Sequence, residues 1–107
     1  MLKYLTAVAI SLVFLLASVT GLAQATGADT YKAKCQMCHG ADGLGNTPAG
    51  KAMNAHPFNS PDVLKESDAD LTTIIKGGKN KMPAFSGKLT DAQITDVLGY
   101  IHTLQKK

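Results

Sequence analysis

The sequence contains no arginine, so lysine supplies all 11 of its fixed positive charges, which stand against 8 acidic residues. The formal net charge of +3 is too small to give an electrostatic case for binding nucleic acid. The sequence also lacks internal repeats, low-complexity tails and any alternating strand pattern, which leaves a helical fold. It offers no pair of carboxylates, no Ser/His/Asp set and no phosphate-binding loop, so these common forms of catalytic chemistry are not indicated.

The start of the chain has the pattern of an export signal rather than of a folded element. Lys3 gives a short positive start, residues 5–19 are almost wholly apolar, and Ala23-Gln24-Ala25 is an A-x-A cleavage site. We expect residues 1–25 to be a cleaved signal peptide and residues 26–107 to form one periplasmic domain without a membrane span. A membrane anchor is the alternative, but the apolar stretch is short for a span and no charged residue stops it. A lipid anchor would need a cysteine near the cleavage site, and the sequence has none there.

Both cysteines of the chain lie in one pentapeptide, Cys35-Gln36-Met37-Cys38-His39. This C-x-x-C-H pattern is typical of covalent attachment of a c-type haem, because each thiol can add to a haem vinyl group while His39 reaches the iron. The C-x-x-C pattern also serves zinc sites and thiol redox sites, and an unligated pair in an exported chain would tend to form a disulfide. Domains of this size often need a covalent link or a bound group for stability, so a bound haem would also stabilise the fold. Haem attachment and thiol–disulfide exchange both stay open at this point.

The first helix is predicted from Gly27 to Cys38. Asp29 or Thr30 places a side-chain oxygen near its start, and Gly40 ends it. Helical spacing places Tyr31 on the same face as both thiols, so the cysteines are expected on the buried side of this helix, at its C-terminal end.

Two further main helices are predicted by capping boxes. Ser67-x-x-Asp70 begins one of them, and Thr90-x-x-Gln93 begins the last. The last helix carries an apolar stripe of i, i+3, i+4, i+7 spacing, made of Ile94, Val97, Leu98, Ile101 and Leu104. Ser60-Pro61 begins a short helical turn, whereas residues 40–60 and 79–89 are expected to be loops that glycine and proline keep irregular. The predicted fold class is all-α.

Met82 is the strongest candidate for a second iron ligand. It lies in a predicted loop, where a methionine has no helical face to fill, and Pro83 stiffens the chain after it. A thioether is a soft ligand that favours ferrous iron. On the residues alone, a methionine that fills a gap in the core is an equal alternative. His56 is expected to be a solvated histidine that could also reach an iron, and His102 a favourable charge at a helix end.

Together these motifs resemble a class I c-type cytochrome, of the small bacterial monohaem kind. The resemblance rests on Cys35-x-x-Cys38-His39-Gly40, Lys81-Met82-Pro83-x-Phe85 and Gly99-Tyr100-Ile101, and it extends over residues 26–107. It implies the cytochrome c fold, with three main helices plus a short helical turn wrapped around one covalent haem c. By the same resemblance, His39 would be the proximal iron ligand and Met82 the distal one.

The resemblance also implies how the helices pack. The first and last helices would cross at near right angles, which would make Gly99 the point of close approach. Tyr31 and Tyr100 would lie near that crossing. A proline carbonyl would accept the second N–H of His39, with Pro48 as first candidate and Pro57 as second.

The function expected from these residues is electron transfer rather than catalysis. The chain would be a soluble periplasmic carrier, a monomer whose single haem iron cycles between Fe(II) and Fe(III) with His/Met ligation. The alternative is a peroxidase-like haem enzyme or a ligand sensor with a labile distal ligand. A thiol oxidoreductase is a third possibility, but no βαβ pattern surrounds the cysteines.

The lysines indicate the kind of partner. Lys51, Lys76, Lys79, Lys81 and Lys88 are expected to rim the exposed haem edge, whereas Asp62, Glu66, Asp68 and Asp70 cluster elsewhere in the sequence. A positive rim steers an acidic partner and raises the association rate more than the affinity. We therefore expect redox partner proteins with an acidic docking surface.

Overall fold

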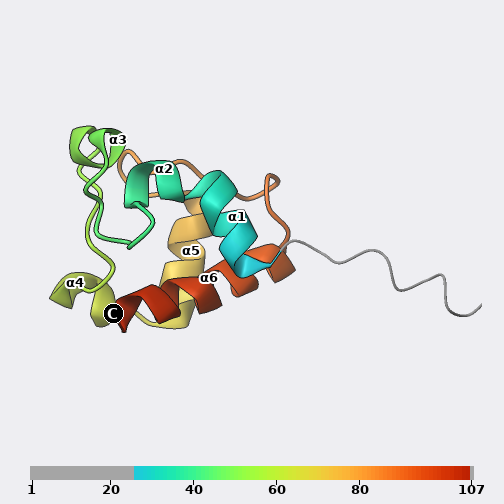
Figure 1. Cartoon of the computed structure of the whole chain (residues 1–107). Helices are drawn as coiled ribbons and strands as arrows, with labels where there is room; N and C mark the ends of the chain where they lie inside the picture. Colours follow the sequence, from blue (N-terminus) through green and yellow to red (C-terminus); the bar gives the residue numbers. More distant parts are fainter. Residues whose placement is uncertain (1–25, 107) are drawn as a thin grey trace, which may run out of the picture.

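The computed structural model describes residues 26–106, so the predicted signal peptide of residues 1–25 lies outside the described residues. This part of the chain is all-α, as predicted, with six helices and no strand. In Figure 1, α1 and α5 rise from α6, which runs along the base of the molecule. The helices are α1 Gly27–Lys34, α2 Gln36–His39, α3 Pro48–Ala52, α4 Pro61–Leu64, α5 Asp68–Gly77 and α6 Asp91–Gln105.

The three main helices each begin with a reciprocal capping box. Ser67 accepts a hydrogen bond from the backbone N–H of Asp70 at 3.1 Å, and Thr90 accepts one from Gln93 at 3.1 Å, as the sequence predicted. For α1 the cap is Thr26, whose hydroxyl accepts from the N–H of Asp29 at 3.2 Å. Asp29 is therefore near the start of α1 as predicted, but as the third residue of the capping box, and Thr26 is the cap. Local side-chain chemistry thus sets where each main helix begins.

Two predicted boundaries are wrong. The first helix does not continue to Cys38: it ends at Lys34, and Cys35, with φ of −119°, separates it from the short helix α2. The predicted loop of residues 40–60 contains the short helix α3, which Thr47 caps through the N–H of Gly50. The predicted turn at Ser60-Pro61 is confirmed as α4. Short helices of one turn leave too weak a periodic pattern to be read from sequence.

The close approach between α1 and α6 depends on a different glycine from the predicted one. A Cβ added at Gly27 would lie 2.1 Å from the carbonyl oxygen of Asp96, so only glycine fits there. A Cβ added at Gly99 would meet nothing within 4 Å among the described residues, so Gly99 is not the contact glycine. The predicted tyrosine pair is confirmed, since the rings of Tyr31 and Tyr100 lie 5.1 Å apart.

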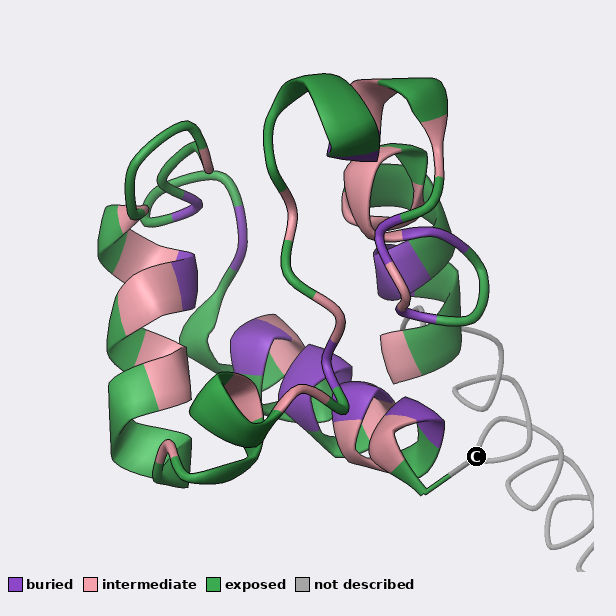
Figure 2. Cartoon of the chain, turned by 90° about the vertical axis from the view of Figure 1, so that its left-hand side faces the viewer, coloured by how far each residue is buried: buried purple, intermediate pink, exposed green. Residues whose placement is uncertain are grey.

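The core is built on α6, and its predicted apolar stripe is buried throughout. Figure 2 shows buried residues gathered along this helix and on the segments that pack against it, while outer faces are exposed. The rest of the core cluster comes from α1, α5 and the connecting segments, through Tyr31, Phe58, Ile75, Phe85 and Leu89. Within residues 26–106, no helix has the length and apolar character needed to cross a bilayer.

Candidate functional site

All four predicted site residues line one cavity of about 730 Å³. Cys35, Cys38 and His39 reach it from the α1–α2 junction, and Met82 reaches it from the loop after α5. The volume lies within the range of pockets that hold small molecules and cofactors. Apolar side chains make most of the remaining wall: Met53, Ala55, Phe58, Val63, Leu71, Ile74, Ile75, Pro83, Phe85, Val97, Leu98 and Ile101. Such a wall offers an apolar surface to a bound cofactor.

The turn of α2 brings the two thiols to the same cavity. The N–H groups of Cys38 and His39 both donate to the carbonyl of Cys35, at 3.3 Å and 3.0 Å. Both cysteines are half-buried free thiols. Burial, and next the nearby Cys38, raises the pKa of Cys35 to about 11. A redox-active cysteine needs a lowered pKa, so this environment argues against thiol–disulfide exchange.

A zinc site finds no support around the cysteines. Among residues 26–106, no group of three or more His, Cys, Asp or Glu side chains is arranged to hold a metal ion. Structural zinc sites use four such ligands. The described residues thus give no four-ligand set for a structural zinc ion.

His39 presents a neutral imidazole to the cavity. Its ring stacks on Phe58, with centroids 4.6 Å apart and the planes inclined by 27°. Burial lowers the pKa of His39, which favours the neutral form that binds metals. Nδ1 is buried and has no hydrogen-bond partner within the described part of the chain, so neither Pro48 nor Pro57 accepts from it as predicted. The carbonyl of Pro57 accepts instead from the N–H of Ser60, at 3.1 Å.

A tight turn presents Met82 to the cavity. Lys79 and Met82 exchange two backbone hydrogen bonds, of 3.2 Å and 2.9 Å, and Asn80 takes a φ of 54° between them. The side chain of Met82 is half-buried and packs against the core cluster. Met53 and His56 line the same cavity, so three groups with ligand chemistry face it besides His39. The geometry brings Met82 and His39 to one site without assigning the ligand.

The charges around the cavity are mixed, although the acids lie apart from the rim lysines in the sequence. Lys79 and Lys81 line the cavity as expected, but Asp62 and Glu66 line it too. Lys34 and Lys65, which the sequence did not single out, are also part of the lining. Lys65 forms an ion pair with Asp62 at 3.4 Å. The other predicted rim lysines differ in their surroundings. Lys76 forms an ion pair with Asp91 at 2.9 Å, and Lys88 lies over the ring of Phe85. Lys51 is not among the cavity residues.

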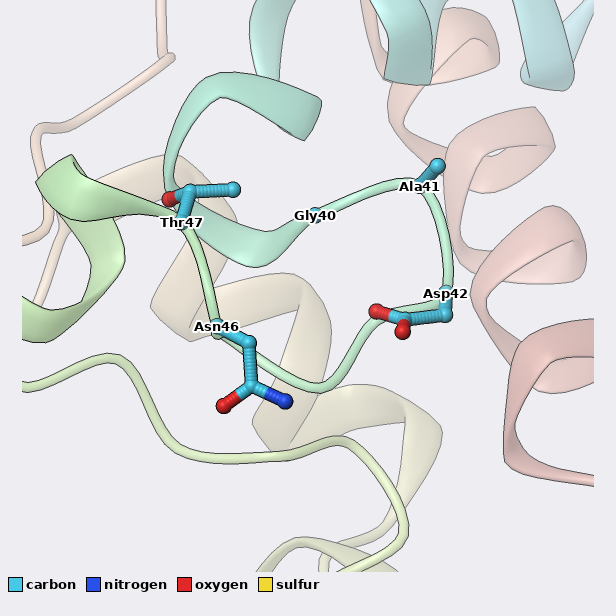
Figure 3. Close-up of a pocket in the computed structure, with 5 residues that line it drawn as sticks. All are labelled: Gly40, Ala41, Asp42, Asn46 and Thr47. Atoms are coloured by element: carbon cyan, nitrogen blue, oxygen red, sulfur yellow. The ribbon is translucent and has the colours of Figure 1, made fainter.

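A second, smaller hollow lies behind the C-x-x-C-H turn. Figure 3 shows the loop that forms it, with Gly40, Ala41, Asp42, Asn46 and Thr47 around a space of about 260 Å³. Thr47 Oγ1 donates to the carbonyl of Met37 at 2.6 Å and accepts from the N–H of Gly50 at 2.9 Å, and Tyr31 Oη donates to the carbonyl of Gly40 at 2.6 Å. These bonds hold the turn that carries His39. Sequence reasoning missed Thr47, whose only local signal is that it precedes Pro48.

Comparisons with known proteins agree on one family. A family model described as "Cytochrome C oxidase, cbb3-type, subunit III" matches residues 22–101. Cytochrome c6 of Parathermosynechococcus lividus is 35% identical over 81 residues, which cover 72% of this chain and 85% of that protein. The cbb3-type cytochrome c oxidase subunit CcoP of Azospirillum brasilense is 32% identical over 89 residues, or 81% of this chain and 30% of that protein. Among solved structures, the KustC0563 c-type cytochrome superposes with a TM-score of 0.69 at 26% identity, covering 76% of this chain and 99% of that one.

Proposed function

The chain belongs to the cytochrome c family, and from this premise we propose that it is a soluble, exported, monomeric electron carrier with a single covalently bound haem c. Membership of this family makes the protein a haem-iron electron-transfer protein rather than an enzyme. The observation that carries the finer proposal is the meeting of Cys35, Cys38, His39 and Met82 around one largely apolar cavity. In this proposal the thiols tether the haem, and His39 and Met82 are its axial ligands.

The residues around the cavity fit a haem. Two half-buried free thiols one helical turn apart can both bond to one cofactor edge, and a neutral imidazole follows directly. When bound, haem supplies one-electron chemistry at its iron. His39 would supply a nitrogen ligand and Met82 a soft thioether that raises the reduction potential. The apolar part of the wall would lie against the cofactor, with the imidazole of His39 in the same cavity.

The alternative proposal is a haem enzyme or ligand sensor with a labile distal ligand. The observation that bears on it is that Met53 and His56 line the same cavity as Met82. Iron with a vacated distal position would be high-spin, whereas fixed His/Met ligation would give a low-spin spectrum. The absorption spectrum of the haem-loaded protein therefore separates the two proposals.

The expected partners are redox proteins with an acidic docking surface. Positive charge at the cavity comes from Lys34, Lys79 and Lys81, which form no ion pair among the described residues. A fourth lysine of the lining, Lys65, is paired with Asp62. Glu66 offsets part of this charge. The net positive balance supports steering of an acidic partner, although less strongly than a rim of lysines alone would.

The test of the proposed function is the mass and spectrum of the mature protein from a host that matures c-type cytochromes. We expect a chain that begins at Thr26, carries one haem after acid–acetone extraction, and shows low-spin c-type bands when reduced. Cys35→Ser and Cys38→Ser are the matched controls, because each should remove one thioether bond. An unmodified chain mass would refute covalent attachment, and a high-spin spectrum would favour the enzyme or sensor. An N-terminus other than Thr26 would refute the cleavage site.

A further inference from the structure

A hydrogen-bonded cluster outside the cavity connects α5 and α6 to Phe58. His102 Nε2 lies 2.7 Å from Oδ1 of Asp68, and His102 Nδ1 lies 2.7 Å from Oε1 of Gln105. The side-chain amide of Gln105 then donates from Nε2 to the carbonyl of Phe58, at 3.1 Å. The cluster therefore joins the first residue of α5 and the last turn of α6 to the segment between α3 and α4.

The partners of this cluster determine the protonation state of His102. The carbonyl of Phe58 can only accept, so the amide of Gln105 must direct its NH₂ there and its oxygen toward His102. A carboxylate at Asp68 can also only accept. Both ring nitrogens of His102 therefore face acceptors, and only the imidazolium form can donate to both at once. Loss of one proton must break one of the two contacts or turn the amide of Gln105 away from Phe58.

Phe58 lies between this cluster and His39 in the chain of contacts. Its side chain is 8% exposed, and its ring stacks on the imidazole of His39 with centroids 4.6 Å apart. The ring also meets Tyr31 edge-on at 6.2 Å, and it fills the space in which a Cβ of Gly43 would lie 2.6 Å from it. Because Phe58 is packed on several sides, a shift of its backbone must also shift the ring that supports His39.

We propose that protonated His102 is a positioning residue: through Gln105 it holds Phe58 against His39, and its deprotonation releases that hold. The proposal rests on the proposed role of His39 as an iron ligand. It assigns the protein a pH-dependent support for the proximal ligand, made by residues that are not part of the cavity lining.

The charges around His102 are consistent with this role. Asp68 faces it from α5, and Lys106 faces it from its own end of the chain. The hydrogen bond to Gln105, followed by that to Asp68, raises the pKa of His102, while partial burial and Lys106 oppose the rise. These contacts favour the imidazolium form, which is the form that can donate to Asp68 and Gln105 at once.

The first test follows the histidine rings, the Gln105 amide and the Phe58 ring by NMR in the reduced, haem-loaded protein as the pH is raised. In the wild type we expect the signals of Gln105, Phe58 and His39 to shift with the same midpoint as His102. In Gln105→Ala, which leaves His102 and Asp68 in place, His102 should still titrate while the shifts of Phe58 and His39 are lost. Thr103→Ala is the matched control, because it changes an exposed residue in the same turn of α6 outside the cluster and should change none of these shifts.

The second test is the reduction potential as a function of pH. The wild type should show a step at the midpoint of His102 that His102→Gln and Gln105→Ala both abolish. A potential step of full size in Gln105→Ala would mean that the charge of His102 acts through space, which would overturn the proposal. NMR signals of the Phe58 ring that do not change as His102 titrates would also overturn it. Failure of the proposed function would appear separately, as a chain without haem whose Gln105 and Phe58 signals still follow His102.

Discussion

At the scale of single residues, the geometry of its turn supports the proposed role of Met82 as the distal ligand. Its turn is closed by the paired backbone bonds to Lys79, and a Cβ added at Gly78 would lie 2.6 Å from the carbonyl of Met82. The backbone of Met82 is thus fixed, which favours one defined ligand geometry. Met53 is 49% exposed, and its N–H donates to the carbonyl of Ala49 at the end of α3.

We predict that Met82→Ala lowers the reduction potential and lets carbon monoxide bind. Loss of the thioether removes the ligand that stabilises ferrous iron, and axial ligands change haem potentials by on the order of 0.1 V or more. Voltammetry and the spectrum with and without carbon monoxide measure both effects. Met53→Ala and His56→Ala are the controls and should keep the wild-type values. If Met82→Ala keeps the wild-type potential and spectrum while Met53→Ala or His56→Ala changes them, the residue replaced in that control is the distal ligand.

The two glycines at the α1–α6 pair give a second prediction at residue scale. Gly27→Ala should destabilise the protein by roughly 1–3 kcal/mol, because its Cβ would overlap the backbone of Asp96. Gly99→Ala should stabilise it by about 0.5–1 kcal/mol, because the added methyl group meets open space and alanine favours a helix. Urea unfolding of the three proteins provides the measurement. Destabilisation by both substitutions would return Gly99 to the role first expected for it.

At the scale of elements, the ends of α5 and α6 are joined by an ion pair that depends on pH. The hydrogen bond to Gln105 is the main cause that raises the pKa of His102, and Asp68 adds to it. The pair is well exposed, with 73% of the Asp68 side chain open to solvent, so its contribution is at most about 1 kcal/mol.

We predict that this contribution disappears as the pH rises. Below about pH 6.5, the ordinary pKa of histidine, His102 is protonated in both the folded and unfolded chain, and the full stabilisation is present. As the pH passes through the raised pKa of the folded state, the stabilisation is lost. Urea unfolding should therefore show wild type more stable than His102→Gln in mild acid and similar to it in alkali. An advantage for wild type that grows with pH would contradict the sign.

At the scale of the whole molecule, the mixed charge around the cavity sets the expected response to salt. Lys79 and Lys81 lie at the cavity, whereas Lys32 lies exposed on α1 and is not among the cavity residues. Because Asp62 and Glu66 share the rim, steering should come from the local excess of lysine and not from the overall charge.

We predict that reversing a rim lysine slows oxidation by ferricyanide, a small anionic probe of the exposed edge. At low ionic strength, Lys79→Glu and Lys81→Glu should each slow the reaction by about twofold or more, because they weaken attraction of the anion. Lys32→Glu has the same change in net charge and should have a smaller effect. Stopped-flow rates should converge near 0.15 M salt, where charges beyond about 8 Å are largely screened. Equal slowing by all three variants would indicate that only net charge matters.

The sequence by itself determined the features that depend on neighbours along the chain. The capping boxes at Ser67 and Thr90 and the apolar stripe of α6 follow from local geometry, and C-x-x-C-H carries its chemistry in five consecutive residues. The tertiary structure decided what depends on distant segments meeting. It selected Gly27 over Gly99 at the α1–α6 contact, because the approach of the Asp96 backbone leaves no local pattern. It also brought Asp62 and Glu66 to the cavity beside Lys79, and it connected His102 to Phe58 through Gln105, because separation along the chain does not report distance in space.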